Sequence, residues 1–189
     1  MTVTKPRIRP FPIIQLGHPT LWQKSEHVSK DQDLSHIISR MFKTLRHADG
    51  AGLAAPQINQ SLRLFVMDIH PTPRRPKIKK SGELVIINPR IISQSEEVEE
   101  DWEGCLSVTT TSGLVFGKVP RARKIEVTYE DASRTEVKRQ LVDFDARVFL
   151  HEFDHLEGIV FLQRMSKLNE LIDEKTYIGI LKSSNSTKM

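Results

Sequence analysis

The stretch His151-Glu152-Phe153-Asp154-His155 carries two histidines four residues apart. Positions i and i+4 share one face of an α-helix, so the two imidazoles can bind one metal ion. Phe144 and Val148 continue the same stripe, which predicts a helix whose histidines point into the core. Glu152 can reach a water beside such an ion without binding the ion itself. The first hypothesis is therefore a metal-dependent hydrolase.

A hydrolytic site of this type needs a third protein ligand, because one coordination position stays open for water. Cys105 is the only cysteine among 189 residues, so it cannot form an intramolecular disulfide and a reducing compartment is expected. A free cysteine is often just a small buried apolar residue, which is the alternative interpretation. With His151 and His155, its thiolate would give a ligand set suited to zinc or ferrous iron.

A glycine-rich segment, Gly50-Ala51-Gly52-Leu53-Ala54-Ala55-Pro56-Gln57, is the third informative feature. Its glycines allow the backbone to approach a ligand closely, and the Gln57 amide could donate to a developing oxyanion. The segment lacks the Lys-Ser/Thr ending of a P-loop and the third glycine of a dinucleotide-binding loop. Taken alone, a glycine-rich segment of this kind is more often a structural bend than a site.

In this order, the segments Gly50–Gln57, Glu103–Ser107 and His151–His155 resemble the three motifs of the peptide deformylase family. The resemblance extends to about Met165 and includes Ile14–Leu21, Asn88-Pro89 and Val119-Pro120-Arg121. It implies an enzyme that hydrolyses the N-formyl group of N-formylmethionyl nascent peptides and releases formate.

The resemblance also assigns a metal site. Cys105, His151 and His155 are implied to bind one divalent metal ion. Ferrous iron (Fe2+) is the foremost candidate, and Zn2+, Ni2+ or Co2+ are alternatives.

Further roles follow from the same resemblance. Glu152 is implied to be the general acid/base, and Gln57 and the backbone N–H of Leu106 are implied to donate hydrogen bonds to the oxyanion. The residues implied to bind substrate are Gly50, Ala51, Gly52 and Val148.

Two departures from the family pattern stand out. Most members continue after Val108 with a short turn such as Pro-Gly, whereas this chain inserts Thr109-Thr110-Thr111-Ser112-Gly113 before Leu114. That loop borders the substrate entrance in the family, so peptide preference beyond formylmethionine is open. Leu150 replaces a common glutamine before the histidine motif.

Apolar periodicity predicts the main elements. Residues from Leu34 to Leu45 recur at helical spacing and predict a helix over 33–47. Strands are expected at 62–69, 84–88, 124–129 and 136–142, with a turn at 131–134. Helices flanking antiparallel strands indicate an α+β fold, with antiparallel and mixed β-sheets around a central metal-binding helix.

The chain is expected to form a single catalytic domain over residues 1–165, followed by a C-terminal helix and flexible tail over 166–189. The helix is predicted around Leu168, Leu171 and Ile172, and the frayed tail from Ser183. Residues 71–80, rich in proline and basic side chains, are expected to form an exposed loop.

Composition narrows the setting. No stretch of about 18 apolar residues could span a membrane, and the first twelve residues lack the apolar region of a secretory signal. A cytoplasmic protein is expected, with no membrane or DNA partner. The net charge of +4 fits either an evenly solvated surface or transient contact with the ribosome.

Two other functions remain open. A related metallohydrolase could act on other acylated peptides. A non-catalytic protein with a structural metal is less favoured, because closed zinc sites use four protein ligands.

Overall fold

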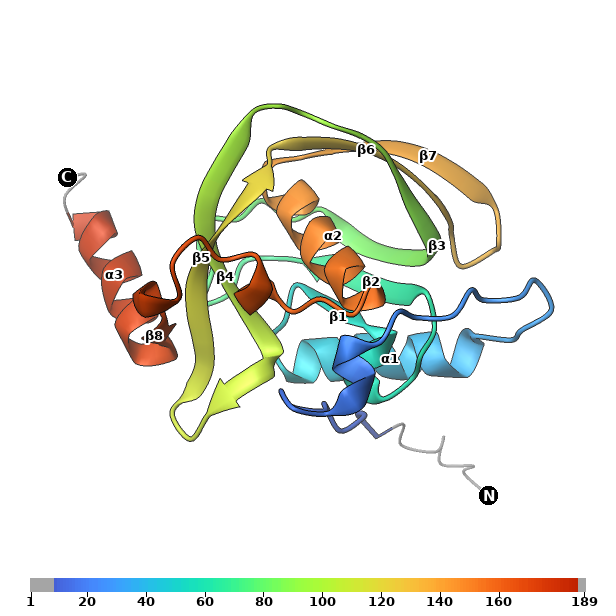
Figure 1. Cartoon of the computed structure of the whole chain (residues 1–189), viewed down its shortest axis with the longest axis horizontal. Coiled ribbons are helices and arrows are strands. Elements are labelled where there is room, and N and C mark those ends of the chain that lie inside the picture. Colours follow the sequence, from blue (N-terminus) through green and yellow to red (C-terminus); the bar gives the residue numbers. More distant parts are fainter. Residues whose placement is uncertain (1–8, 187–189) are drawn as a thin grey trace, which may run out of the picture.

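The computed structural model describes residues 9–186, with side chains described as far as Ser183. Two β-sheets surround a central helix, α2 (Figure 1). The larger sheet has the strand order β1-β2-β3-β6-β7. These strands span Gly52–Ala54, Leu64–Ile69, Gly82–Gln94, Lys124–Glu130 and Glu136–Val142, respectively. The smaller sheet consists of β4 (Val98–Thr110), β5 (Gly113–Ala122) and β8 (Ile172–Asp173).

The helices are α1 (Ser35–His47), α2 (Asp143–Leu156) and α3 (Glu174–Ser186). Short 3-10 helices occupy Pro19–Trp22, Ala55–Ile58, Phe161–Gln163 and Leu168–Glu170. No helix within residues 9–186 is long and apolar enough to cross a membrane. The first eight residues, on which part of the signal-peptide prediction rested, lie outside the described residues.

The predicted α+β fold is confirmed. All strand pairs of the two sheets are antiparallel, and the described residues show parallel pairing only at the bridge between Glu26 and Leu62. Helix α1 and strands β2, β6 and β7 lie within two residues of their predicted bounds.

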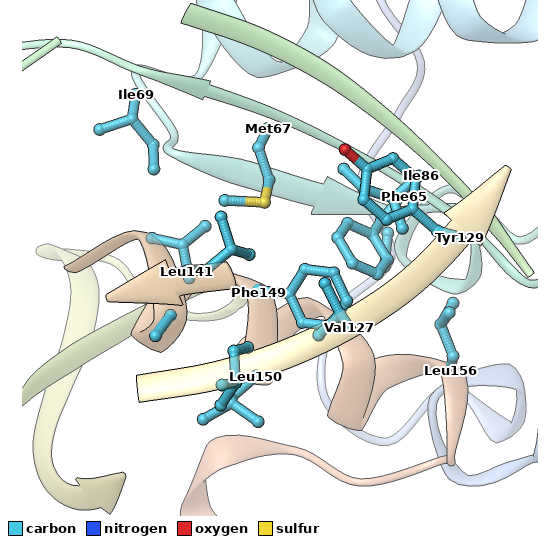
Figure 2. Close-up of a cluster of buried hydrophobic side chains, with 14 of the residues drawn as sticks. Phe65, Met67, Ile69, Ile86, Val127, Tyr129, Leu141, Phe149, Leu150 and Leu156 are labelled. Carbon is cyan, nitrogen blue, oxygen red and sulfur yellow. The ribbon is translucent and has the colours of Figure 1, made fainter. Parts of the chain in front are cut away.

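Strand β2 shows why the core has two layers. All six of its residues are buried, because side chains leave a strand alternately on its two faces and both faces are covered. Phe65, Met67 and Ile69 pack towards α2, where the ring of Phe65 meets Phe149 edge-on at 5.1 Å (Figure 2). Val66 belongs to the cluster on the opposite face, which contains Leu45 of α1. The sheet therefore holds α2 rigidly from one side.

Two motif segments lie in elements that were not predicted for them. The segment around Cys105 is part of β4, and the glycine-rich segment forms β1 and a 3-10 helix. The C-terminal helix was predicted at the wrong place: residues around 168–172 form a 3-10 helix and β8, and the helix, α3, begins at Glu174. Ser183 is helical, not the start of a frayed tail, while residues 187–189 lie outside the described part.

Residues 71–80 do form a loop, but it is only partly exposed. Thr72 is buried, and Arg74 and Arg75 are half-buried against the segment before β1. A solvated loop was expected, whereas the guanidinium groups of Arg74 and Arg75 donate hydrogen bonds to backbone carbonyls. The loop is therefore attached to the core of the molecule.

Candidate metal centre and active site

Helix α2 and strand β4 bring the three predicted ligands together. His151 and His155 lie on one face of α2, and Cys105 comes from β4. One ligand atom from each of the three lies within 4.8 Å of the others, and all three residues are buried. The Cys105 Sγ and His155 Nε2 are 3.2 Å apart. A thiolate and two imidazoles at these separations fit a single divalent cation, with one position left for water.

A buried carboxylate orients the first histidine. The Nδ1 of His151 donates to Glu103 Oε2 at 2.9 Å, which leaves its Nε2 to bind a cation. Arg121 holds Glu103 through two hydrogen bonds of 2.9 and 3.0 Å, and Arg147 adds a third at 3.0 Å. Burial alone would raise the pKa of Glu103, but hydrogen bonds from His151 and Arg121 lower it to about 2. Glu103 is therefore ionised at neutral pH.

The same network fixes α2 against β5. Asp154, one residue before His155, accepts hydrogen bonds from Arg121 at 2.6 Å and from Arg164 at 2.7 Å. Arg147 also donates to the Val119 carbonyl at 2.8 Å. The sequence alone predicted no role for Arg121, Asp154, Arg147 or Arg164. Arg121 and Asp154 stood inside quoted motifs, but nothing in their spacing predicted that they would pair.

Glu152 lies beside the ligands without being one of them. It is buried, and its Oε2 has no hydrogen-bond partner among the described residues, so this oxygen is available to a water or a substrate in the site. Burial raises the pKa of Glu152 to about 7, a value suited to a general acid/base at neutral pH. Gly52 makes room for this side chain, because a Cβ there would lie 2.5 Å from Glu152 Oε1.

The amide of Gln57 has a fixed orientation. Its Oε1 accepts from the Ala54 N–H at 2.8 Å, which turns its Nε2 towards Cys105 Sγ at 3.5 Å and Ser107 Oγ at 3.3 Å. The amide is therefore held by β1 as a donor beside the candidate ligands, where hydrogen-bond donors can stabilise a developing negative charge.

Leu106 follows Cys105 where the β4–β5 pairing is interrupted. The register shifts between Gly104, which faces Phe116, and Thr109, which faces Leu114. Leu106 therefore stands in an irregular part of the strand, next to the candidate ligand Cys105. Thr109 and Thr110 end β4, and Thr111 and Ser112 form the hairpin turn before β5, where Gly113 adopts a φ of 112°.

A pocket opens over this group. It is lined by His151, Glu152, Gln57 and Leu106, whereas Cys105 and His155 do not line it. All four residues implied to bind substrate also line it, namely Gly50, Ala51, Gly52 and Val148. Its other lining residues include the aromatic side chains Trp102, Phe116, Phe144 and Tyr177 and the arginines Arg74, Arg75 and Arg147. Tyr177 lies beyond residue 165, in a segment to which the sequence analysis assigned no catalytic role.

Comparison with known proteins agrees with this arrangement. The polypeptide deformylase family matches residues 10–171. Peptide deformylase 2 of Nostoc sp. is 44% identical over 168 residues, covering 87% of this chain and 92% of the relative. The peptide deformylase of Thermotoga neapolitana is 36% identical, covering 94% of this chain and 98% of the relative.

Solved structures show the same likeness. The class I type b peptide deformylase of Acinetobacter baumannii with bound Met-Ala-Ser has a TM-score of 0.79 at 31% identity, covering 84% of this chain and 99% of that one. The Thermotoga maritima enzyme has a TM-score of 0.74 at 37% identity, again covering 84% and 99%. Family match, relatives and fold agree, and the chain belongs to the polypeptide deformylase family.

Proposed function

We propose that this protein is a metal-dependent peptide deformylase that removes the N-formyl group from N-formylmethionyl peptides and releases formate. The observation that carries the proposal is the buried set of Cys105, His151 and His155 with Glu152 beside it, whose Oε2 has no hydrogen-bond partner among the described residues. Membership of the deformylase family supports the reaction type.

Cys105, His151 and His155 would hold the cation, and Glu103 would orient His151 from behind. When bound, a divalent cation polarises a carbonyl and makes a neighbouring water easier to deprotonate. Of the candidate metals, we favour ferrous iron over Zn2+, Ni2+ or Co2+, because a soft thiolate beside imidazoles suits iron and the family resemblance points the same way.

Glu152 would move the proton. Its carboxylate takes a proton from the water that attacks the formyl carbon, and the same group then delivers a proton to the departing amine. The carbon–nitrogen bond breaks, leaving formate and a free amino terminus. A pKa of about 7 lets one carboxyl group act first as base and then as acid at neutral pH.

Gln57 and Leu106 would stabilise the transition state. When the formyl carbon is attacked, the formyl oxygen gains negative charge. The Gln57 Nε2 and the Leu106 N–H can stabilise this charge by donating hydrogen bonds to the oxygen. Loss of one such donor typically costs about 10²- to 10³-fold in kcat. The Ala54 N–H contributes indirectly, because it fixes the amide orientation of Gln57.

The peptide would lie in the pocket over this group. Gly50, Ala51 and Gly52 present backbone to it, and Val148 offers an apolar surface for the methionine side chain. The Acinetobacter baumannii relative binds the tripeptide Met-Ala-Ser, which supports a peptide beginning with methionine as the occupant. We place the enzyme in the cytoplasm, where its net positive charge would assist transient contact with the ribosome.

The decisive experiment compares acyl groups. Protein purified with ferrous iron without oxygen is incubated with formyl-Met-Ala, acetyl-Met-Ala and Met-Ala, and released formate, acetate and free amines are measured. Formate release from the formyl peptide, with little acetate from its acetyl analogue, is expected. Comparable acetate release would favour the alternative, a metallohydrolase of other acylated peptides. Absence of any turnover by metal-loaded protein would favour a non-catalytic metal protein.

A further inference from the structure

The C-terminal helix forms a wall of the pocket. The ring of Tyr177 on α3 stacks on Phe116 of β5, with centroids 4.0 Å apart and planes inclined by 13°. Trp102 of β4 meets Tyr177 edge-on at 6.1 Å. All three rings line the pocket, and α3 lies alongside the β4–β5 pair (Figure 1). We call Trp102, Phe116 and Tyr177 the aromatic wall.

Strand β4 leaves space for this wall. A Cβ at Gly104 would lie 2.7 Å from the Phe116 ring, so a side chain there would displace Phe116 and the tyrosine stacked on it. Gly104 directly precedes the candidate ligand Cys105. The wall therefore begins next to the metal centre.

Glu174 ties α3 to two other segments. Its Oε1 accepts from Arg74 Nε at 2.6 Å, and its Oε2 accepts from the Leu114 N–H at 2.9 Å. Tyr177 donates its hydroxyl to the Arg74 carbonyl at 3.1 Å. The helix is thus fixed both to the hairpin turn that departs from the family pattern and to the loop at 71–80. These contacts hold the Tyr177 ring in place within the pocket.

The position of the wall follows from how α2 crosses β4. His151 and Arg147 both bond the Glu103 carboxylate, and Arg147, one turn earlier on α2, also bonds the carbonyls of Asp101 and Glu99 further along β4. Moving along α2 away from the metal ligands therefore means moving along β4 towards Trp102. One helical turn is about 5.4 Å, and an extended peptide advances about 3.4 Å per residue. A peptide that starts at the metal ligands and runs in this direction would bring one of its next two residues to the wall.

The chemistry of the wall is apolar. Arg74 uses its donors on Glu174 and on the carbonyls of Ala48 and Asp49. Arg75 donates to carbonyls, including those of Asp49 and Gly50. These bonds use Nε and Nη1 of Arg74 and all three side-chain nitrogens of Arg75. An incoming side chain therefore meets mainly ring surfaces, which bind aromatic and large apolar groups.

Resting on the proposed function, we infer that Trp102, Phe116 and Tyr177 form a subsite for a side chain that follows the formylated methionine. The subsite selects an aromatic or large apolar residue at one of the two next positions. Tyr177, supplied by the C-terminal helix, is its specificity-determining residue.

The test uses formyl-Met-X-Ser and formyl-Met-Ala-X peptides, with X as Phe, Leu, Ala or Asp. The wild-type enzyme should prefer Phe over Ala by about 3- to 10-fold in kcat/KM at one of these positions. Tyr177→Ala should reduce that ratio below about 2-fold, because the loss of the ring falls mainly on the phenylalanine peptide. Tyr177→Phe should keep the preference, because it retains the ring, and Lys175→Ala, an exposed change on the same helix, should also keep it.

A binding measurement separates this inference from the proposed reaction. Trp22→Phe leaves Trp102 as the single tryptophan, so its fluorescence reports occupation of the wall by Met-Phe-Ser or Met-Ala-Ser. Tighter binding of the phenylalanine peptide, lost in Tyr177→Ala, supports the subsite even if no formate is released.

Two results would overturn the subsite. One is an unchanged Phe-to-Ala ratio in a Tyr177→Ala protein of normal helix content, with formate still released. The other is a wild-type preference for Asp, which would assign recognition to the arginines instead.

Discussion

Gly52→Ala perturbs the proposed acid/base without touching a metal ligand. A Cβ at residue 52 would lie 2.5, 2.6 and 2.8 Å from Oε1, Cγ and Cδ of Glu152. Ordinary contacts between such atoms are about 3.5–4.0 Å, so the carboxylate must move by about 1 Å. Glu152 is buried on a helix fixed by the Arg121–Asp154 ion pair, so it cannot swing into solvent.

Overpacking of this kind costs about 1–3 kcal/mol of stability. A displacement of about 1 Å in a reacting group lowers turnover by about 10²-fold. Gly52→Ala should therefore keep a full equivalent of metal, lose about 1–3 kcal/mol in urea unfolding, and release formate about 100-fold more slowly.

Gly179→Ala is the matched control. No heavy atom lies within 4 Å of a Cβ built at Gly179, which is within α3. The substitution should stabilise the helix by up to about 1 kcal/mol and leave formate release unchanged. Wild-type turnover by Gly52→Ala, or loss of its metal, would refute the placement of Glu152 described above.

Three further predictions follow from the site and its supports. Cys105→Ala and His155→Ala should each lose stoichiometric metal binding, and a full equivalent of tightly bound metal in either would refute the three-ligand set. The ferrous enzyme should be the most active form and lose activity in air, whereas equal activity of zinc and iron preparations would contradict this preference. Burial alone would raise the pKa of Glu174, but hydrogen bonds from Arg74 and the Leu114 N–H lower it. Its stabilising contribution is therefore present above pH 4.5 and lost in more acidic solution. In urea unfolding at pH 7, Glu174→Gln should be about 1–2 kcal/mol less stable than wild type, and this difference should shrink towards pH 3. A stability difference between Glu174→Gln and wild type that does not change with pH would contradict the proposed contribution of the Glu174 carboxylate.

The metal set could be predicted because its signal is local. His151 and His155 need only helical spacing to share a face, and a single cysteine left one thiol to complete the set. Helix α1 and strands β6 and β7 were predictable for a similar reason, since their apolar residues follow a simple period.

Strands β4 and β5 were missed because no such period marks them. The first half of β4 is charged and exposed, and β5 is mostly buried and contains Pro120. Side-chain bonds between residues far apart in the sequence could not be predicted from local patterns either. The Arg121–Glu103 bond joins residues 18 apart, and the Arg74–Glu174 bond joins residues 100 apart. Tyr177 lines the pocket because such contacts hold α3 in place, and no sequence motif predicted them.

The most direct test of the mechanism is the rate of formate release by Glu152→Gln with its metal content measured in the same sample. Glutamine keeps the shape of the side chain and removes its exchangeable proton, so the variant should retain a full equivalent of metal. Its kcat for formyl-Met-Ala should fall by about 10²- to 10⁴-fold, with little change in KM. Near wild-type turnover with metal bound would contradict Glu152 as the proton-transfer group, and loss of the metal would make it a ligand or a structural support instead.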